Sequence, residues 1–140
     1  MSKQTVPFRR WHIAWLQANG GGSLPFDVDT LMSLEKQNSW TGVADGDPIA
    51  CGGTIQQWPG RHHAWMLMNA VTGPHMRFIT NQVLKCLKSV EGRIELTVRA
   101  DFAQGHRWAK MLGFRVETPV LVAFGPEGEN HTGYTRFNKG

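Results

Sequence analysis

The sequence predicts an α/β (α+β) fold with a mixed, mostly antiparallel sheet of about six strands and helices on both faces. Turn signals divide residues 40–71 into three short apolar segments, which is typical of an antiparallel meander. A helical pattern and an alternating segment follow, so a strand-helix-strand crossover is added to the meander. With 140 residues, of which 41% are hydrophobic, the chain 1–140 has the length and composition of a single domain.

Two short helices are expected before the first strand. Four residues recur at helical spacing and predict the buried face of the first helix: Phe8, Trp11, Trp15 and Ala18. Asp27 is a good N-cap for the second helix. Strands are then expected over residues 40–44, 49–57 and 62–71.

The second half of the chain begins with a helix, which follows the turn at residues 72–74 that ends the preceding strand. Pro74 is expected at its first position and Gly92 at its end. Residues 93–99 alternate cleanly and predict a strand. Asp101 and Gln104 resemble a capping box for the next helix, which runs through Trp108 to a left-handed glycine at Gly113. The last two strands are expected over 114–124, which Pro119 marks as an edge or bulge, and over 131–137.

The net charge of +4 is concentrated in the middle of the chain. The segment from Arg61 to Arg115 has nine basic and three acidic residues. Such a segment can face a nucleotide phosphate or a nucleic acid, but it is more typical of an ordinary solvated surface. Its aromatic residues fit core faces and do not alternate with Lys and Arg, so nucleic acid is the least favoured partner.

Several classes of protein are not expected. No apolar run is long enough to span a membrane, and no signal peptide precedes the first helix. Cys51 and Cys86 do not form a disulfide framework, and no pair of side chains has metal-ligand spacing, so no metal is expected. The composition predicts a cytoplasmic protein with reduced thiols.

One motif carries a resemblance to a known family. The run GHRWAKMLGF, Gly105–Phe114, follows the strand that ends at Arg99. In this order of elements the chain resembles the GNAT (GCN5-related N-acetyltransferase) fold. It resembles more closely a group of small phage and prophage proteins with a GNAT-like fold, related to the internal virion protein of short-tailed phages. The segments that carry this closer resemblance include Trp58–Arg61, Arg93–Glu95, Gly105–Phe114 and Gly125–Gly128.

The resemblance implies acetyl-CoA as the cofactor. The fourth core strand would pair with the pantetheine arm, and the turn after it would hold the pyrophosphate. The residues that match these positions are Met68, Asn69, Ala70, Val71, Gly73, His75, Met76 and Arg77. Of the family's glycines only Gly73 is present, and side chains at the later positions obstruct a close backbone approach. His75 and Arg77 can replace the glycines as cationic phosphate ligands, or they can be simply solvated.

The resemblance also implies a general acid, usually a tyrosine on the second core helix. This chain has Ala109 at that position, and its only tyrosine is Tyr134. Candidates for a general base are His63, Asp101, His106 and Glu117. Asp101 is more simply explained as a helix cap, and the others are more often ordinary surface or satisfied polar side chains.

Two functions therefore compete. The first is a phage- or prophage-type accessory or virion-associated protein with a degenerate acetyl-CoA site and a protein partner, such as a phage structural protein. The alternative is an active acetyl-CoA-dependent N-acetyltransferase that acts on an amine of a protein or small molecule. Trp58, in a turn, is expected to be exposed and would suit a contact surface.

Overall fold

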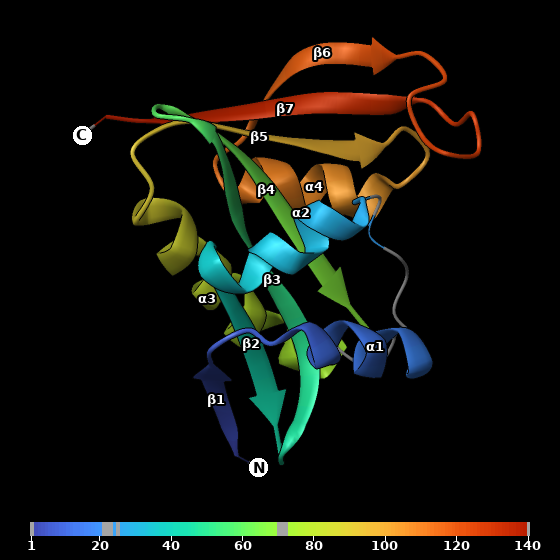
Figure 1. Cartoon of the computed structure of the whole chain (residues 1–140). Helices are drawn as coiled ribbons and strands as arrows, with labels where there is room; N and C mark the ends of the chain where they lie inside the picture. Colours follow the sequence, from blue (N-terminus) through green and yellow to red (C-terminus); the bar gives the residue numbers. More distant parts are fainter. Residues whose placement is uncertain (1, 21–23, 25, 70–72, 140) are drawn as a thin grey trace. The chain divides into compact units, whose positions relative to one another are not determined.

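The computed structural model describes residues 2–20, 24, 26–69 and 73–139, and Figure 1 shows the arrangement of their helices and strands. The described residues form a seven-stranded sheet in the order β1-β2-β3-β4-β5-β7-β6, together with four α-helices. This mixed α/β architecture confirms the predicted class. The strands are β1 Lys3–Val6, β2 Asn38–Ala44, β3 Asp47–Trp58, β4 Arg61–Met68, β5 Gly92–Arg99, β6 Arg115–Leu121 and β7 His131–Asn138. The helices are α1 Arg10–Ala18, α2 Val28–Ser33, α3 Met76–Lys88 and α4 Ala103–Met111, with 3-10 turns at η1 Leu34–Lys36 and η2 Gly73–His75.

The chain divides into two compact units. Unit 1 comprises Met1–Ile55 and Ala64–Ser89, and unit 2 comprises Gln56–His63 and Val90–Gly140. The boundary falls within β3 and β4, so the tip of the hairpin that joins these strands belongs to unit 2.

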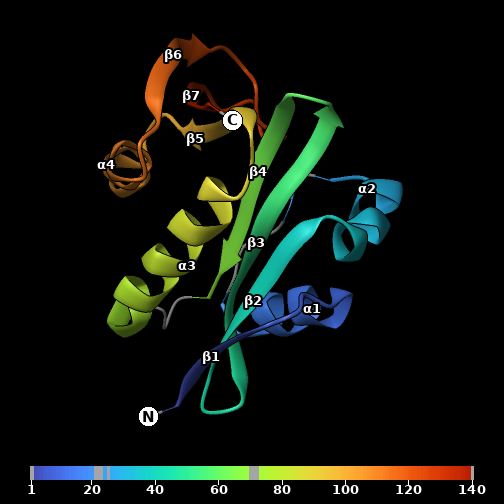
Figure 2. The same cartoon turned by 90° about the vertical axis from the view of Figure 1, so that its left-hand side faces the viewer.

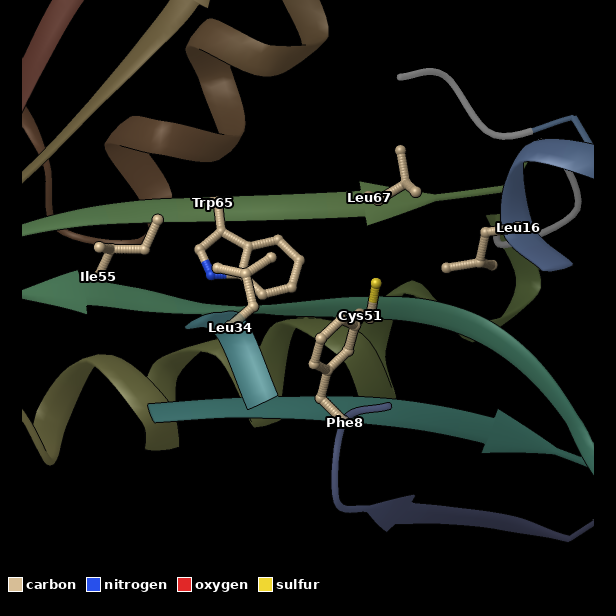
Figure 3. Packing of buried hydrophobic residues seen from close by; sticks show 7 residues of the cluster. All are labelled: Phe8, Leu16, Leu34, Cys51, Ile55, Trp65 and Leu67. Carbon is tan, nitrogen blue, oxygen red and sulfur yellow. The ribbon is translucent and has the colours of Figure 1, made fainter. Parts of the chain in front are cut away.

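In unit 1, helices lie on both faces of β2, β3 and β4. Figure 2 shows α3 on one face and α1 with α2 on the other. A core cluster includes residues from α1, η1, β3 and β4, and its aromatic centre is an edge-to-face pair of Phe8 and Trp65, with ring centroids 5.3 Å apart (Figure 3). The cluster consists of Phe8, Leu16, Leu34, Cys51, Ile55, Trp65 and Leu67.

The burial predicted for Phe8 is confirmed, but within helix α1 the buried residues differ from the predicted Trp11, Trp15 and Ala18. Phe8, His12 and Leu16 are the buried residues, whereas Trp11 is 59% and Trp15 38% exposed. His12 is tolerated inside because its Nδ1 atom accepts from the Arg9 amide at 3.0 Å and lies 2.7 Å from the Thr41 hydroxyl. Burial lowers the pKa of His12, so the ring is neutral near pH 7.

Strand β1 was not predicted. It pairs with β2 in antiparallel register, from Lys3 opposite Ala44 to Val6 opposite Thr41. Its residues are largely exposed and show no apolar alternation, so the sequence gives no strand signal there. The Thr5 hydroxyl also donates to the Gln82 side chain of α3, at 3.1 Å.

In unit 2, β5 lies between the start of β4 and β7, and β6 is the edge strand. Figure 1 shows α4 alongside β5 and β7. The β6–β7 ladder shifts register on both sides of Thr118, which confirms the predicted edge or bulge near Pro119.

Three predicted helix boundaries were wrong. Pro74 lies inside the 3-10 turn η2, and α3 starts two residues later with His75 as its N-cap. Gly92 does not end α3, which stops at Lys88, but begins β5. The predicted capping box of α4 is absent: its N-cap is Phe102, and the Asp101 carboxylate instead accepts from Nε of Arg99 at 3.0 Å.

Candidate functional site

The end of β4 is the first part of the candidate cofactor site. Met68 is the last residue of β4 and is half-buried. Asn69 is buried, and its backbone N–H donates to the carbonyl of Ile49 at 3.3 Å. Ala70 and Val71 lie outside the described residues.

The start of α3 is the second part of this site. No side chain caps its first turn, and that turn contains no acidic residue. Arg77 is exposed in the same turn. The amide groups at a helix N-terminus carry partial positive charge, so this end of the 13-residue helix suits an anion such as a phosphate.

The side chains that replace the family's glycines differ in their exposure. His75 is only 9% exposed. This burial contradicts the alternative that His75 is a solvated surface side chain. Its Nδ1 atom has no hydrogen-bond partner among the described residues. Met76 is half-buried, and a Cβ added at Gly73 would meet no atom within 4 Å. The obstruction expected from the side chains after Gly73 stays a prediction. The orphaned His75 nitrogen and the uncapped helix end are compatible with a phosphate group.

The candidate catalytic residues belong to unit 2. Asp101 is exposed, and its carboxylate forms a surface ion pair with Arg99. Among the described residues, no hydrogen bond or ion pair joins Asp101, His106 and Glu117 to one another. The structure therefore does not assemble these three into one site.

His106 and Tyr134 form a pair that connects α4 to β7. The hydroxyl of Tyr134 lies 2.7 Å from Nδ1 of His106, and Nε2 of the same ring lies 3.0 Å from the carbonyl oxygen of Ala100. A carbonyl can only accept, so in the neutral ring Nε2 carries the proton and Nδ1 accepts from the hydroxyl. Burial raises the pKa of Tyr134. Both ring nitrogens of His106 are therefore engaged within the protein.

Glu117 belongs to a network of alternating charges across β4, β5 and β6. Both oxygens of Glu117 accept from Arg93, whose Nε also donates to Glu95. Arg61 makes a bidentate pair with Glu95, with both N–O distances 2.9 Å. The Arg61 and Arg93 hydrogen bonds lower the pKa of Glu95, and Arg93 does the same for Glu117.

Glu95 was not among the predicted candidates. The signal that could have found it is the alternation of residues 93–99, which places Arg93 and Glu95 on one face of the strand. Trp58, 56% exposed as predicted, stacks on the Arg61 guanidinium, with 4.6 Å from Cζ to the ring centroid.

His63, one of the candidate bases, is half-buried. It pairs with Glu95 at the third and last position of the parallel β4–β5 ladder. Burial lowers the pKa of His63; the charge of Arg61 adds to this effect and the charge of Glu95 opposes it.

Other candidate sites are not found. Among the residues with described positions, no group of three His, Cys, Asp or Glu side chains could hold a metal ion. Both cysteines are free and buried, and burial raises the pKa of the Cys51 thiol to about 12. No helix in the described ranges has the length and hydropathy needed to cross a membrane.

Comparisons with known proteins identify structural neighbours only. No family model and no curated protein matches the sequence. An acetyltransferase of the GNAT family from Streptococcus pneumoniae superposes with a TM-score of 0.71 at 8% identity, covering 96% of this chain and 98% of that chain. The ribosomal-protein-S18-alanine N-acetyltransferase of Escherichia coli gives 0.72 at 14% identity, with 99% and 97% covered. A chain of the NatC complex bound to Gag peptide and CoA gives 0.77 at 12% identity, with 99% and 100% covered.

At these identities the likeness establishes the fold. The chain has the GNAT fold, as the resemblance of Gly105–Phe114 predicted. The relation to phage and virion proteins stays a prediction.

Proposed function

We propose that this GNAT-fold chain is an acetyl-CoA-dependent N-acetyltransferase that acts on an amine of a protein or small molecule. The observation that carries the proposal is the start of α3, an uncapped helix N-terminus with an exposed arginine and no acidic residue, which follows β4 and the 3-10 turn η2 in the chain. Two structural neighbours support it, one named as an alanine N-acetyltransferase and one bound to CoA.

Each part of the proposed site has a defined task. The amide groups of the first turn of α3 and the guanidinium of Arg77 bind the phosphates. The end of β4, through Met68, lies along the pantetheine arm. When bound, acetyl-CoA supplies a thioester whose carbonyl carbon is open to attack by an amine nitrogen.

A second candidate function is the accessory or virion-associated protein with a degenerate site. The observation that favours it is Ala109, a 3%-exposed residue of α4 at the position where the family carries its tyrosine. In that case the fold is retained for a protein partner such as a phage structural protein, in the host cytoplasm or the virion. Trp58, exposed and stacked on Arg61, is the side chain best suited to such a contact.

Calorimetric titration with acetyl-CoA and CoA separates the two candidates. The acetyltransferase is expected to bind acetyl-CoA with a micromolar Kd, which corresponds to about −8 kcal/mol. Arg77→Glu should weaken this binding at least tenfold, because it places a negative charge beside the phosphates. Lys85→Glu, on an exposed position in the last turn of the same helix, is the matched control and should leave the Kd unchanged.

The opposite results are equally informative. No binding at millimolar acetyl-CoA would reject the acetyltransferase and favour the degenerate site. Micromolar binding that is insensitive to Arg77→Glu would show that the phosphates lie elsewhere.

A further inference from the structure

Helix α1 is held at its start by two ionisable side chains. The first backbone N–H groups of a helix have no partner within the helix. The amide of Arg9, the N-cap, donates to Nδ1 of His12 at 3.0 Å. The next amide, that of Arg10, donates to the Glu35 carboxylate at 2.7 Å. The Thr41 hydroxyl of β2 lies 2.7 Å from the same Nδ1 atom of His12, so this ring connects the start of the helix to the sheet.

The contact of His12 with the Arg9 amide requires a neutral ring. A backbone N–H can only donate, so Nδ1 is the acceptor, and in the neutral ring Nε2 carries the proton. A proton on Nδ1 would place two N–H groups against each other and leave the amide without its acceptor. His12 is only 4% exposed, so water does not replace the lost partner while α1 stays in place.

The charges around His12 mostly oppose its protonation. Arg9 and Arg10 lie at the same end of α1, where the helix dipole is also positive. On the sheet side, β2 has no charged residue, and the Cys51 thiol of β3 is neutral because burial raises its pKa to about 12. Burial and the charge of Arg9 lower the pKa of His12, and the charge of Glu35 in η1 acts in the opposite direction.

Helix α1 contributes to the core of unit 1 and depends on it. Phe8, just before the helix, and Leu16, within it, belong to the buried cluster shown in Figure 3. With nine residues, α1 is too short to be a stable helix by itself. Strand β1, in contrast, pairs with β2 independently of α1, through the four residue pairs from Lys3 to Val6. Detachment of α1 would therefore unfold the helix and expose the two apolar side chains without breaking the β1–β2 ladder.

We propose that the contact of His12 with the Arg9 amide and the Thr41 hydroxyl is an acid-sensitive latch, which lets α1 detach from β2 while the strands of unit 1 stay paired. The inference goes beyond the proposed acetyltransferase function and does not depend on it. In the detached segment the His12 ring has its ordinary pKa of 6.5, whereas its pKa in the docked helix is lower. Protonation therefore favours detachment. The ratio of detached to docked protein should rise about tenfold for each pH unit below 6.5, and level off below the pKa of the docked ring.

The test is amide hydrogen exchange of the wild-type chain between about pH 7.5 and about pH 5. The intrinsic pH dependence of exchange is divided out, so that protection factors are compared. Peptides within residues 10–18 should lose protection about tenfold per pH unit below 6.5. Peptides within residues 49–55 of β3 should keep theirs and provide the internal control. Constant protection of α1 over this range, or an equal loss in β3, overturns the latch.

His12→Asn and His12→Gln form a matched pair of variants, since neither side chain titrates. The Asn Oδ1 atom is as many bonds from the backbone as Nδ1 of histidine and can accept from the Arg9 amide, whereas the Gln oxygen is one bond further away. Both variants should remove the pH dependence of α1 protection, and His12→Asn should retain more protection than His12→Gln. A folded His12→Asn in which α1 still loses about tenfold per pH unit rejects the latch and assigns the effect to another group, such as Glu35.

An NMR titration of the histidine rings in the wild-type chain keeps the proposal testable if neither variant folds. The His12 ring should titrate below 6.5, and the loss of α1 protection should level off below the pH of that titration. A His12 ring that titrates at or above 6.5 overturns the proposal, as does a loss of protection that does not follow its titration.

Discussion

Single residues were predictable where their role depends only on nearby backbone. Asp27 caps α2 as expected, and its carboxylate accepts from the Thr30 amide at 2.8 Å. Gly113 ends α4 in the left-handed region, with φ +92°. Asp101 failed as a cap because a competing partner, the guanidinium of Arg99, holds its carboxylate. The ion pair of Arg61 with Glu95 joins residues 34 positions apart, so no local sequence pattern predicts it.

Gly92 gives a prediction about a close backbone approach. It begins β5 with φ +102°, and a Cβ there would lie 2.6 Å from the carbonyl oxygen of Gly60. That oxygen accepts from the Arg93 amide at 2.9 Å, so the two backbones cannot separate without losing this bond. Gly92→Ala should lower the free energy of unfolding by about 2–4 kcal/mol, from left-handed strain plus overpacking.

Gly46→Ala is the matched control for Gly92→Ala. Gly46 has φ +88°, but an added Cβ would meet no atom within 4 Å. Only the left-handed strain applies, so the expected loss is about 1 kcal/mol. Urea unfolding measures both losses, and equal losses would contradict the close approach of Gly92 to Gly60.

Glu95 gives a prediction about pH. Its hydrogen bonds to Arg61 and Arg93 lower its folded-state pKa, so its contribution to stability is present above the unfolded value of about 4.5 and is lost as the pH falls through the lower, folded-state value. Glu95→Gln should therefore lower the free energy of unfolding by about 1–2 kcal/mol at pH 7 and progressively less below pH 4.5. Glu127→Gln, at an exposed loop position, should have little effect at either pH. A Glu95→Gln deficit that is constant with pH would contradict the network.

Whole elements were predicted where the hydrophobic pattern and the turns agree. The β2–β3 hairpin follows from its Asp45–Gly46 turn, since both residues adopt positive φ, as such tight turns require. The faces of α1 were assigned wrongly because tryptophans at helical spacing indicate a stripe but not its direction. Phe8, His12 and Leu16 have the same spacing of four residues and form the buried stripe. Composition alone cannot decide which of the two stripes is buried, because the stripe that is buried contains a polar residue, His12, whose hydrogen bonds are made inside the protein.

The two faces of α1 should respond differently to truncation. Leu16 is fully buried, so Leu16→Ala should cost about 2–5 kcal/mol of stability through lost packing and a cavity. Trp11 is 59% exposed, so Trp11→Ala should cost under about 1 kcal/mol although it removes a larger side chain. Thermal or urea unfolding of the two variants compares them directly. A larger loss of stability for Trp11→Ala than for Leu16→Ala would contradict the buried stripe of the structure and support the face predicted from the sequence.

The molecule as a whole was predictable through the order of its elements. The meander, the crossover and the Gly105–Phe114 run indicated the GNAT fold, and structural neighbours confirm it. Strand β1 and the division into two units were not predicted, because long-range pairing leaves little local signal. The candidate cofactor segment was assigned by resemblance and stays a prediction, whereas the burial of His75 and the uncapped start of α3 depend on tertiary packing that the sequence does not show.

The most direct test of the central claim is amide hydrogen exchange with and without acetyl-CoA. If acetyl-CoA binds along β4 and at the start of α3, exchange should slow in peptides that cover residues 64–79. Peptides from α1, which the proposed site does not include, should be unchanged and provide the internal control. Unchanged exchange throughout the chain at millimolar acetyl-CoA, or protection confined to segments outside 64–79, would contradict the proposed acetyltransferase site.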